Sequence, residues 1–294
     1  MDGFLLVNKA GGMTSHDVVA KVRKRLGTKK VGHAGTLDPM ATGVLVLGVG
    51  NATRLLQYVV DGTKGYQANI GLGKSTLTDD IEGEVISVAD AAKLSQITDE
   101  MIRTELAKMV GNISQRPSSV SAIKVDGKTG HERVRAGETF ELPSREVTIT
   151  SIDVQEITRH DSAILIKVEV ICSAGTYIRA IARDLGDALE VGGHLTSLHR
   201  TLVSPFDISE CAPLETAELI STADGISRIL PSRSLTFDEL AEIKFGRGIY
   251  PNPQTGMYVA LSSDGEYAAL LENKAFGEKI LAAPTLVSVK ESTS

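Results

Sequence analysis

The residues of this chain best suited to chemistry lie in the run VGHAGTLDPMATG, between Val31 and Gly43. The run places the carboxylate of Asp38 near the imidazole of His33 and has neither a helical nor a strand period, which predicts a shaped loop. Pro39 biases the residue before it toward an extended backbone. A carboxylate on a constrained loop is a candidate nucleophile or base. Aspartate and proline are also common in plain turns, so an Asp38 that only caps a turn is the alternative.

A second group of chemical side chains ends a predicted strand, in the run CSAGTYIR from Cys172 to Arg179. Small residues stop the strand and a helix begins, so Tyr177 and Arg179 fall in the first turn, a position that suits the wall of a cleft. An exposed ion pair on the helix is the alternative for Arg179. Tyr66, which follows Lys64 in a KGY run at the start of a strand, is by itself typical of half-buried packing.

These residues need a scaffold, and the hydrophobic pattern predicts a mixture of strands and helices. Strands are predicted at 4–8, 44–49, 66–72, 84–88, 121–125, 147–157, 163–172 and 196–206. Helices are predicted at 14–26, 53–60, 98–110 and 177–189. Because strands and helices do not alternate regularly, we expect an α+β fold with a mainly antiparallel central sheet flanked by helices. Beyond Pro231, a short helix at 235–245, a hairpin at 258–271 and a strand at 280–289 predict a small β-rich C-terminal domain.

Length and composition limit the class of protein. At 294 residues with 42% hydrophobic content, the chain is long enough for one large domain and a small one. No apolar run reaches the roughly 18 residues of a membrane span, and the N-terminus lacks the pattern of a signal peptide, so we expect a cytoplasmic protein. The two cysteines, Cys172 and Cys211, lack the spacing of a zinc site or a disulfide framework, so we expect no metal.

The distribution of charge favours binding to nucleic acid although the net charge is −6. Residues 1–60 hold eight Lys and Arg against three Asp and Glu, whereas residues 205–294 hold seven against thirteen. The densest basic stretch is KVRKRLGTKK, from Lys21 to Lys30. Phosphate contacts depend on local fields, so this N-terminal part can bind RNA while the acidic C-terminal part faces elsewhere. A solvated helix face is the plain alternative.

One apparent motif is rejected. The run GLGKST from Gly71 to Thr76 resembles the end of a phosphate-binding P-loop, but the glycine that the pattern requires five positions before Gly73 is Ala68. The acidic segment from Leu77 to Gly83 follows where a P-loop would begin a helix. We therefore do not expect nucleotide hydrolysis.

Taken together, the motifs resemble the TruB family, the tRNA pseudouridine(55) synthases. The resemblance starts at FLLVNK (4–9), continues through GMTSH (12–16), the G-x-LDP segment and LVLG (45–48) to TRL (53–55), and returns in the K-x-Y and C-S-x-G-T-Y-I-R runs. It implies that Asp38 is the essential catalytic carboxylate and that Tyr66 lies against the target uracil. It also implies that Arg179 forms an ion pair with Asp38, which it orients. The residues that it implies in substrate binding are Lys9, His33, Lys64, Lys124, Tyr177 and Leu198.

For the molecule as a whole, the resemblance implies the pseudouridine synthase fold in residues 1–231, with an RNA-gripping insertion at about 112–146 that includes Lys124. Residues 232–294 are similar to PUA-like RNA-binding domains, and a structural cap is the alternative. The expected partner is the T-stem-loop of tRNA, whose uridine at position 55 is flipped out of its loop and leaves a space in which His33 stacks. We expect a monomer without an obligate protein partner.

The chemistry that the resemblance implies needs no cofactor, because breaking C1′–N1 and forming C1′–C5 involves no net redox change. Asp38 would attack C1′ or C6, or stabilise a cationic sugar, in the manner of carboxylates that act on glycosidic bonds. Deprotonation at the sugar, helped by Tyr66, is a further option. A competing hypothesis is a tRNA-binding folding factor in which isomerisation is secondary or absent.

Overall fold

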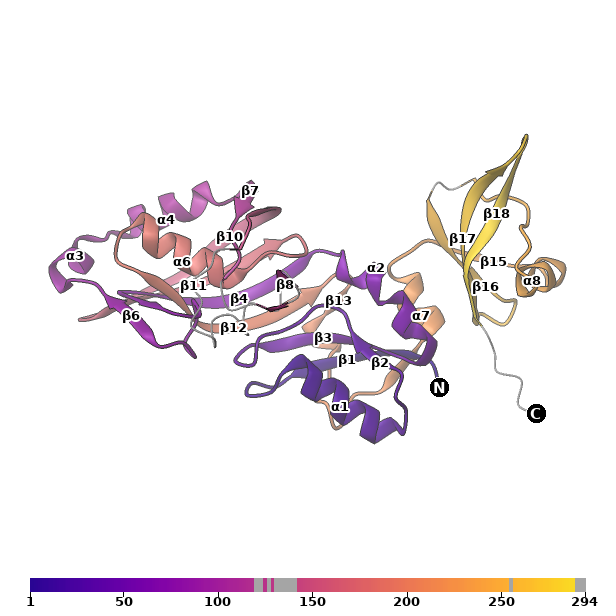
Figure 1. Cartoon of the computed structure of the whole chain (residues 1–294), viewed down its shortest axis with the longest axis horizontal. Coiled ribbons are helices and arrows are strands. Elements are labelled where there is room, and N and C mark those ends of the chain that lie inside the picture. The colour runs from indigo at the N-terminus through magenta and orange to yellow at the C-terminus, as the bar shows by residue number, and fades with distance from the viewer. Residues whose placement is uncertain (119–123, 126–127, 130–141, 254–255, 289–294) are drawn as a thin grey trace.

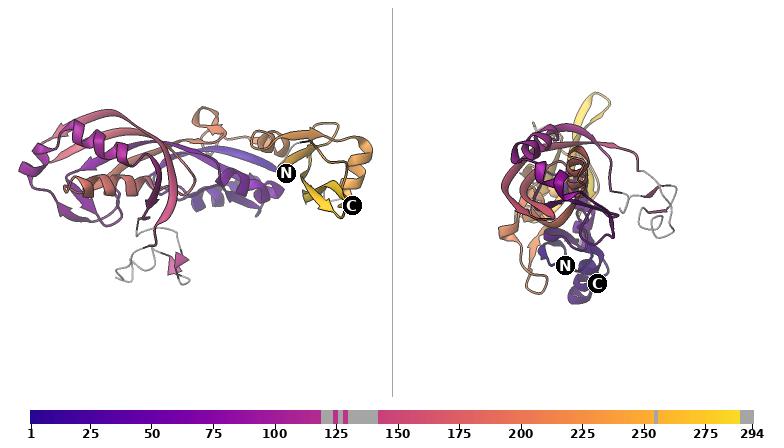
Figure 2. Two further views of the ribbon diagram at one scale, coloured as in Figure 1. Left: turned by 90° about the horizontal axis from the view of Figure 1, so that it is seen from above. Right: turned by 90° about the vertical axis from the view of Figure 1, so that its left-hand side faces the viewer.

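The computed structural model describes residues 1–118, 124–125, 128–129, 142–253 and 256–288. A large sheet with helices packed on it makes up most of the molecule, and a smaller sheet follows at the C-terminal end (Figure 1). Seen from above, the molecule is elongated, with the smaller sheet at one end (Figure 2). The active-site residues predicted above all come from the larger part.

Within the described residues, the large sheet has ten strands, in the order β14-β1-β3-β12-β4-β11-β10-β7, with β2 paired to β3 and β13 to β12. All of these pairs are antiparallel except β3 with β12, which is parallel. The predicted α+β fold with a mainly antiparallel sheet is confirmed. The strands are β1 (Gly3–Lys9), β2 (Val31–His33), β3 (Thr42–Val49), β4 (Lys64–Leu72), β7 (Gly111–Gln115), β10 (Arg145–His160), β11 (Ala163–Cys172), β12 (Gly193–Val203), β13 (Phe206–Asp207) and β14 (Leu219–Ser221).

Helices cover this sheet in two groups. They are α1 (Ser15–Leu26), α2 (Leu56–Val60), α3 (Ala91–Gln96), α4 (Asp99–Lys108), α6 (Ile178–Ala188) and α7 (Thr222–Ser227), with short 3₁₀ turns at Gly50–Leu55 and Ile208–Glu210. Helix α1 begins at a capping box formed by Thr14 and Asp17, and it ends at Gly27 in the left-handed conformation. Its buried valines pack on β1 and β3, whereas α4 and α6 share a core with β4, β11 and β12.

The parallel contact between β3 and β12 joins the two halves of the sheet. In this contact His199 is opposite Thr42, and Arg200 is opposite Gly43. Gly43 has φ +103°, and a Cβ there would lie 2.2 Å from the backbone oxygen of Arg200. The strands can therefore approach only because position 43 is glycine. The loop between β2 and β3, which carries Asp38, lies at this junction.

Four further strands and one helix form the C-terminal part: β15 (Ser232–Ser234), α8 (Phe237–Lys244), β16 (Met257–Leu261), β17 (Tyr267–Phe276) and β18 (Lys279–Val287). The strand order is β15-β16-β17-β18. Val259 and Leu270 of this sheet lie in one buried cluster with Phe4 and Ile226 of the larger part. The two parts are thus packed together through apolar side chains.

Some local expectations differ from the structure. The helix predicted at 53–60 is a 3₁₀ turn followed by the short α2, and the run predicted as a loop begins as strand β2. Three residues are too few to show an alternating pattern. Two short strand pairs, β5 (Lys74–Thr76) with β6 (Val85–Val88) and β8 (Lys124–Val125) with β9 (Lys128–Thr129), lie apart from the large sheet. No helix in the described ranges is long and apolar enough to cross a membrane.

Candidate active site

The loop that carries Asp38 is fixed by hydrogen bonds from several elements. The hydroxyl of Ser15, at the start of α1, accepts from the backbone N–H of Leu37 at 2.9 Å and donates to its carbonyl at 3.2 Å. The ammonium of Lys9 donates to the carbonyl of Pro39 at 3.3 Å. Because the residues on both sides of Asp38 are held, its carboxylate has a defined direction. Its side chain remains 30% exposed and faces a pocket.

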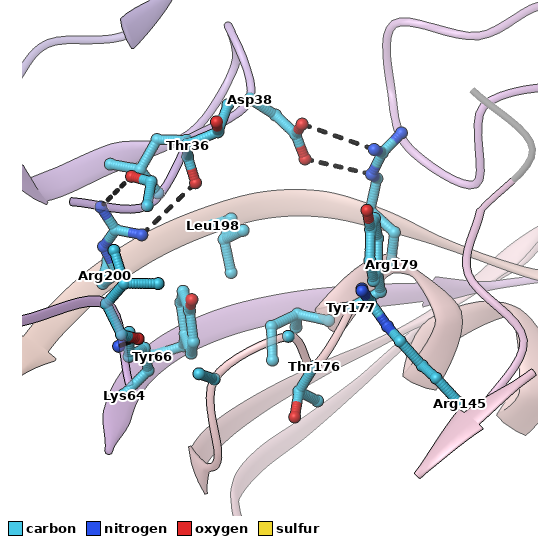
Figure 3. A pocket seen from close by; sticks show the side chains of 16 residues that line it. Thr36, Asp38, Lys64, Tyr66, Arg145, Thr176, Tyr177, Arg179, Leu198 and Arg200 are labelled. Carbon is cyan, nitrogen blue, oxygen red and sulfur yellow. Dashed lines mark hydrogen bonds and ion pairs between the residues drawn. The ribbon is translucent and has the colours of Figure 1, made fainter. Parts of the chain in front are cut away.

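Arg179, in the first turn of α6, holds that carboxylate with two nitrogens. Its Nε lies 3.1 Å from Oδ2 of Asp38, and its Nη2 donates to Oδ1 at 3.4 Å. The remaining nitrogen, Nη1, donates to Oδ2 of Asp80 at 3.2 Å and to the carbonyl of Thr78 at 2.9 Å. A guanidinium has a fixed fork of donors, so its contacts with Asp80 also set the angle at which it meets Asp38. The ion pair expected between Asp38 and Arg179 is present (Figure 3).

The carboxylate opens into a pocket with a volume of about 380 Å³. Tyr66 from β4, Leu198 from β12 and Tyr177 from the start of α6 line it together with Asp38 and Arg179. In Figure 3 the ring of Tyr66 lies on the same side as Arg200, and the side chain of Leu198 lies between Arg200 and Arg179. A pocket with aromatic and aliphatic walls and a few charged groups at fixed positions is suited to a flat, partly polar ring.

Tyr177 is held from two directions. The side-chain amide of Gln115, which is 2% exposed, accepts from the N–H of Tyr177 at 2.8 Å and donates to its carbonyl at 3.1 Å. The guanidinium of Arg145 stacks over the ring of Tyr177, 4.6 Å from its centroid. These contacts fix Tyr177, the residue directly before α6, and therefore help to fix the direction of Arg179 two residues later.

Lys64 and Tyr66 lie side by side on the opposite wall. The ammonium of Lys64 donates to the carbonyls of Val59, Val60 and Gly62, and burial lowers its pKa to about 8. Burial raises the pKa of the Tyr66 phenol, although the charge of Arg200 acts in the opposite direction. The phenol is therefore a neutral proton donor over the physiological range of pH.

No group of three or more His, Cys, Asp or Glu side chains that could hold a metal ion occurs among the residues described. In this site, the chemistry available to the chain comes from one accessible carboxylate, the phenols and the cations around the pocket. A carboxylate in such a position can act as a nucleophile, as a base, or as an anion that stabilises positive charge.

Comparison with known proteins decides which family has this site. Residues 23–178 match the TruB family pseudouridylate synthase (N terminal domain). A tRNA pseudouridine synthase B of Corynebacterium glutamicum (strain R) is 48% identical over 277 residues, which cover 92% of each chain. The protein of the same name from Rhodococcus jostii (strain RHA1) is 50% identical over 281 residues, covering 92% of this chain and 90% of that one. The chain belongs to the TruB family of pseudouridylate synthases.

Solved structures agree with this family at the level of the fold. A structure of an H/ACA RNP bound to a substrate RNA containing 2′-deoxyuridine contains a chain with a TM-score of 0.70 and 22% identity, over 97% of this chain and 84% of that chain. A chain of an archaeal box H/ACA sRNP Nop10-Cbf5 complex gives a TM-score of 0.68 at 20% identity, over 97% and 85%. These structures show that the chain has the pseudouridine synthase fold. The family and the relatives described above show that it is an isomerase.

Not every residue predicted for the site of this TruB-family enzyme lines the pocket. Asp38, Lys64, Tyr66, Tyr177, Arg179 and Leu198 do. Lys9 lies beneath the loop, 1% exposed, with its ammonium bonded to the carbonyls of Ala10, Met13 and Pro39. It therefore supports the loop from below. Lys124 belongs to β8, and its side chain lies outside what the structure describes.

His33 lies outside the pocket lining, at the end of β2. Its ring meets the ring of His16 edge to face, with 5.5 Å between the centroids. Burial lowers the pKa of His33, and the neighbouring His16 lowers it further. His16 is exposed on α1, so the pair lies beside the basic stretch of that helix.

Three charged residues of the TruB-family site were missed from the sequence: Arg145, Arg200 and Asp80. Arg200 is 2% exposed and lines the pocket two residues after Leu198 on β12, so the alternation of a strand puts both on one face. The two-residue spacing from Leu198 could therefore have identified Arg200 from the sequence. Asp80 is 3% exposed and lies in the acidic segment after the rejected P-loop, where nothing in the sequence indicates a partner 99 positions away.

Proposed function

We propose that this enzyme converts uridine to pseudouridine in tRNA, and that its target is the T-loop uridine at position 55. The single observation that carries the proposal is the Asp38 carboxylate, oriented by Arg179 and open to a pocket of about 380 Å³. The proteins named tRNA pseudouridine synthase B, which are about half identical to this chain over most of their length, support tRNA as the substrate.

A uridine inside a folded loop cannot reach such a pocket unless it is flipped out of its stack. The flipped base needs a new aromatic neighbour, since base–aromatic stacking is worth about 1–3 kcal/mol per base. Tyr66 and Tyr177 are the aromatic side chains that line the pocket. Leu198 supplies an apolar wall that excludes water, which would otherwise trap the sugar once its base has detached.

In the proposed reaction, C1′–N1 breaks, the uracil turns, and C5 bonds to C1′. Asp38 acts as the nucleophile at C1′ or C6, or as the anion that stabilises a cationic sugar. The proton lost from C5 and the proton gained at N1 balance, so the step needs no oxidant, reductant or cofactor. Tyr66, which lines the pocket, would donate or accept a proton beside the ring.

The RNA would also contact the basic N-terminal face. The side chains of Lys21, Lys24, Lys29 and Lys30 are exposed on and just after α1. Exposed lysines of this kind are suited to phosphate contacts. We further propose that residues 1–231 form the synthase domain, with an RNA-gripping insertion at about 112–146, and that residues 232–294 form a PUA-like module.

The test uses unmodified tRNA transcript, in which pseudouridine is mapped after incubation with the wild type and with Asp38→Asn. Asparagine keeps the shape of the side chain, so we expect no conversion while the Kd for tRNA stays within about tenfold. Asp161→Asn, in the exposed turn between β10 and β11, is the matched control and should convert at the wild-type rate. Conversion by Asp38→Asn would refute the catalytic assignment. A wild type that binds tRNA without converting it would favour the folding-factor hypothesis.

A further inference from the structure

Arg200 is the largest side chain that is completely enclosed in the described parts of the molecule. Each of its three nitrogens donates to a backbone carbonyl: Nε to Val44 at 2.8 Å, Nη2 to Gly35 at 3.1 Å and Nη1 to Thr36 at 3.4 Å. These carbonyls belong to the Asp38 loop and to the strand that follows it. The side chain thus connects β12 to both ends of the loop.

The charge of Arg200 is not matched by an anion. Among the described residues, no carboxylate lies within ion-pair distance of its guanidinium, whereas Arg179 is paired with both Asp38 and Asp80. Enclosing a cation without a counter-ion costs several kcal/mol, and an apolar side chain of similar size would avoid that cost. A purely structural role in the sheet therefore does not account for an arginine here.

The unmatched charge lies against the pocket. Arg200 lines it, and in the register between β12 and β4 it lies opposite Tyr66. Figure 3 shows Arg200, Tyr66 and Lys64 on one side of the pocket and Arg179 with Tyr177 on the other. A flat base placed between Tyr66 and Asp38 would have this cation at its edge.

We propose that Arg200 is a positioning residue that holds the Asp38 loop on the sheet and keeps the Tyr66 side of the pocket positive, where the uracil gains negative charge. The inference rests on the proposed function. If Asp38 attacks C1′, the electron pair of the C1′–N1 bond stays on the uracil, and if it attacks C6, negative charge moves onto the ring and its carbonyl. Both routes place negative charge on the uracil, so a fixed cation at its edge stabilises either one.

The phenol of Tyr66 provides a readout of the charge at position 200. Tyr66 is affected by burial, by Cys172 on β11 and by Asp38, all of which raise its pKa, and by Arg200 on β12, which lowers it. Lys64 precedes it on β4. Removing the charge at position 200 should therefore raise the titration midpoint of Tyr66.

Two substitutions compare a side chain without the charge of Arg200 with one that keeps it. Arg200→Gln loses the charge and retains one amide group, at the position of the nitrogen that donates to Val44, and Arg200→Lys keeps the charge but has fewer donors in a different geometry. In single-turnover assays with tRNA, we expect Arg200→Gln to lose about 100-fold or more in rate, comparable to the loss of one oxyanion-hole donor, and Arg200→Lys to lose less. The Kd for tRNA should stay within about threefold in both. Arg228→Met is the control: it removes a more exposed arginine at the C-terminal end of α7 and should keep the wild-type rate.

The second measurement follows the tyrosine Cζ signals by ¹³C NMR in the protein alone, with Tyr66 assigned from Tyr66→Phe. We expect the Tyr66 midpoint to rise in Arg200→Gln and to stay near the wild-type value in Arg200→Lys. An unchanged midpoint in Arg200→Gln, an unchanged rate, or failure of both variants to fold would overturn the proposal. Absence of conversion by the wild type would instead overturn the proposed function, and the NMR result would still stand.

Discussion

Replacement of Gly43 by alanine tests whether the parallel contact between β3 and β12 positions the catalytic loop. The added Cβ would lie 2.2 Å from the carbonyl oxygen of Arg200, 2.8 Å from its nitrogen and 2.9 Å from its carbonyl carbon. All three are backbone atoms, so the clash cannot be relieved by rotating a side chain. The strands must separate, and Arg200 must move with them.

The magnitude follows from two contributions. A residue with a Cβ at φ +103° is strained by about 1–2 kcal/mol, and forcing a methyl group into a packed contact adds about 1–3 kcal/mol. We therefore expect Gly43→Ala to lower the free energy of unfolding by about 2–5 kcal/mol. Gly27→Ala is the matched control, because Gly27 has φ +63° with nothing within 4 Å of the added Cβ. It should lower the free energy of unfolding only by the backbone contribution, about 1–2 kcal/mol.

The assay measures urea unfolding and single-turnover pseudouridine formation for both variants. If the separation of the strands shifts Arg200 by about 1 Å, the loop that its side chain holds is displaced as well. A misplacement of that size can reduce a rate about 100-fold. We expect that loss in Gly43→Ala and a rate near the wild type in Gly27→Ala. If the two variants had equal stabilities and equal rates, the argument that this strand contact positions Asp38 would be refuted.

Two further predictions concern the walls of the pocket. Gln115→Leu leaves the N–H of Tyr177 without its partner, whereas the carbonyl of Tyr177 keeps the N–H groups of Ala180 and Ile181. The substitution should lower the free energy of unfolding by about 1–3 kcal/mol and slow the reaction, whereas Gln67→Leu, on an exposed position of β4, should do neither. Equal effects of the two substitutions would contradict the role of Gln115 in holding Tyr177. The pKa of Lys64 is about 8 in the folded protein and 10.5 in the unfolded reference, so only the unfolded chain binds this proton between those values. The free energy of unfolding of the wild type should therefore rise relative to Lys64→Met as the pH goes from 8 to 10.5, as measured by urea unfolding, and a constant difference would refute it.

The elements of the larger part were largely predictable because their signals are local. Alternating apolar residues define β11, which was predicted at its observed bounds, and a capping pair with a C-terminal glycine defines α1. The small β-rich C-terminal part was predicted for the same reason, from a helix followed by a hairpin and a strand. The order of strands in the sheet was not predictable, because it depends on contacts such as β3 with β12 between residues about 157 positions apart.

Site residues that lie in a sequence motif were predictable. Site residues whose role depends on a contact in the folded chain were not. Asp38 and Arg179 lie in distinctive runs, and the structure pairs them. Lys9 lies in such a run as well, but its ammonium is directed to carbonyls under the loop. Arg200 and Asp80 lie in runs without a chemical pattern. Their importance comes from burial and from partners distant in sequence, which only the folded chain provides.

The charges of the pocket fit the charge separation that the proposed reaction requires. When C1′–N1 breaks, the sugar carbon becomes more positive and the uracil more negative. Asp38 supplies an anion on one side, and Arg179 cannot cancel it fully because its guanidinium is shared with Asp80. Arg200 and Lys64 supply cations on the other side, bonded to neutral carbonyls, so their charge is not cancelled. The fold fixes these charged side chains before the substrate arrives, so the protein does not need to reorganise as the C1′–N1 bond breaks.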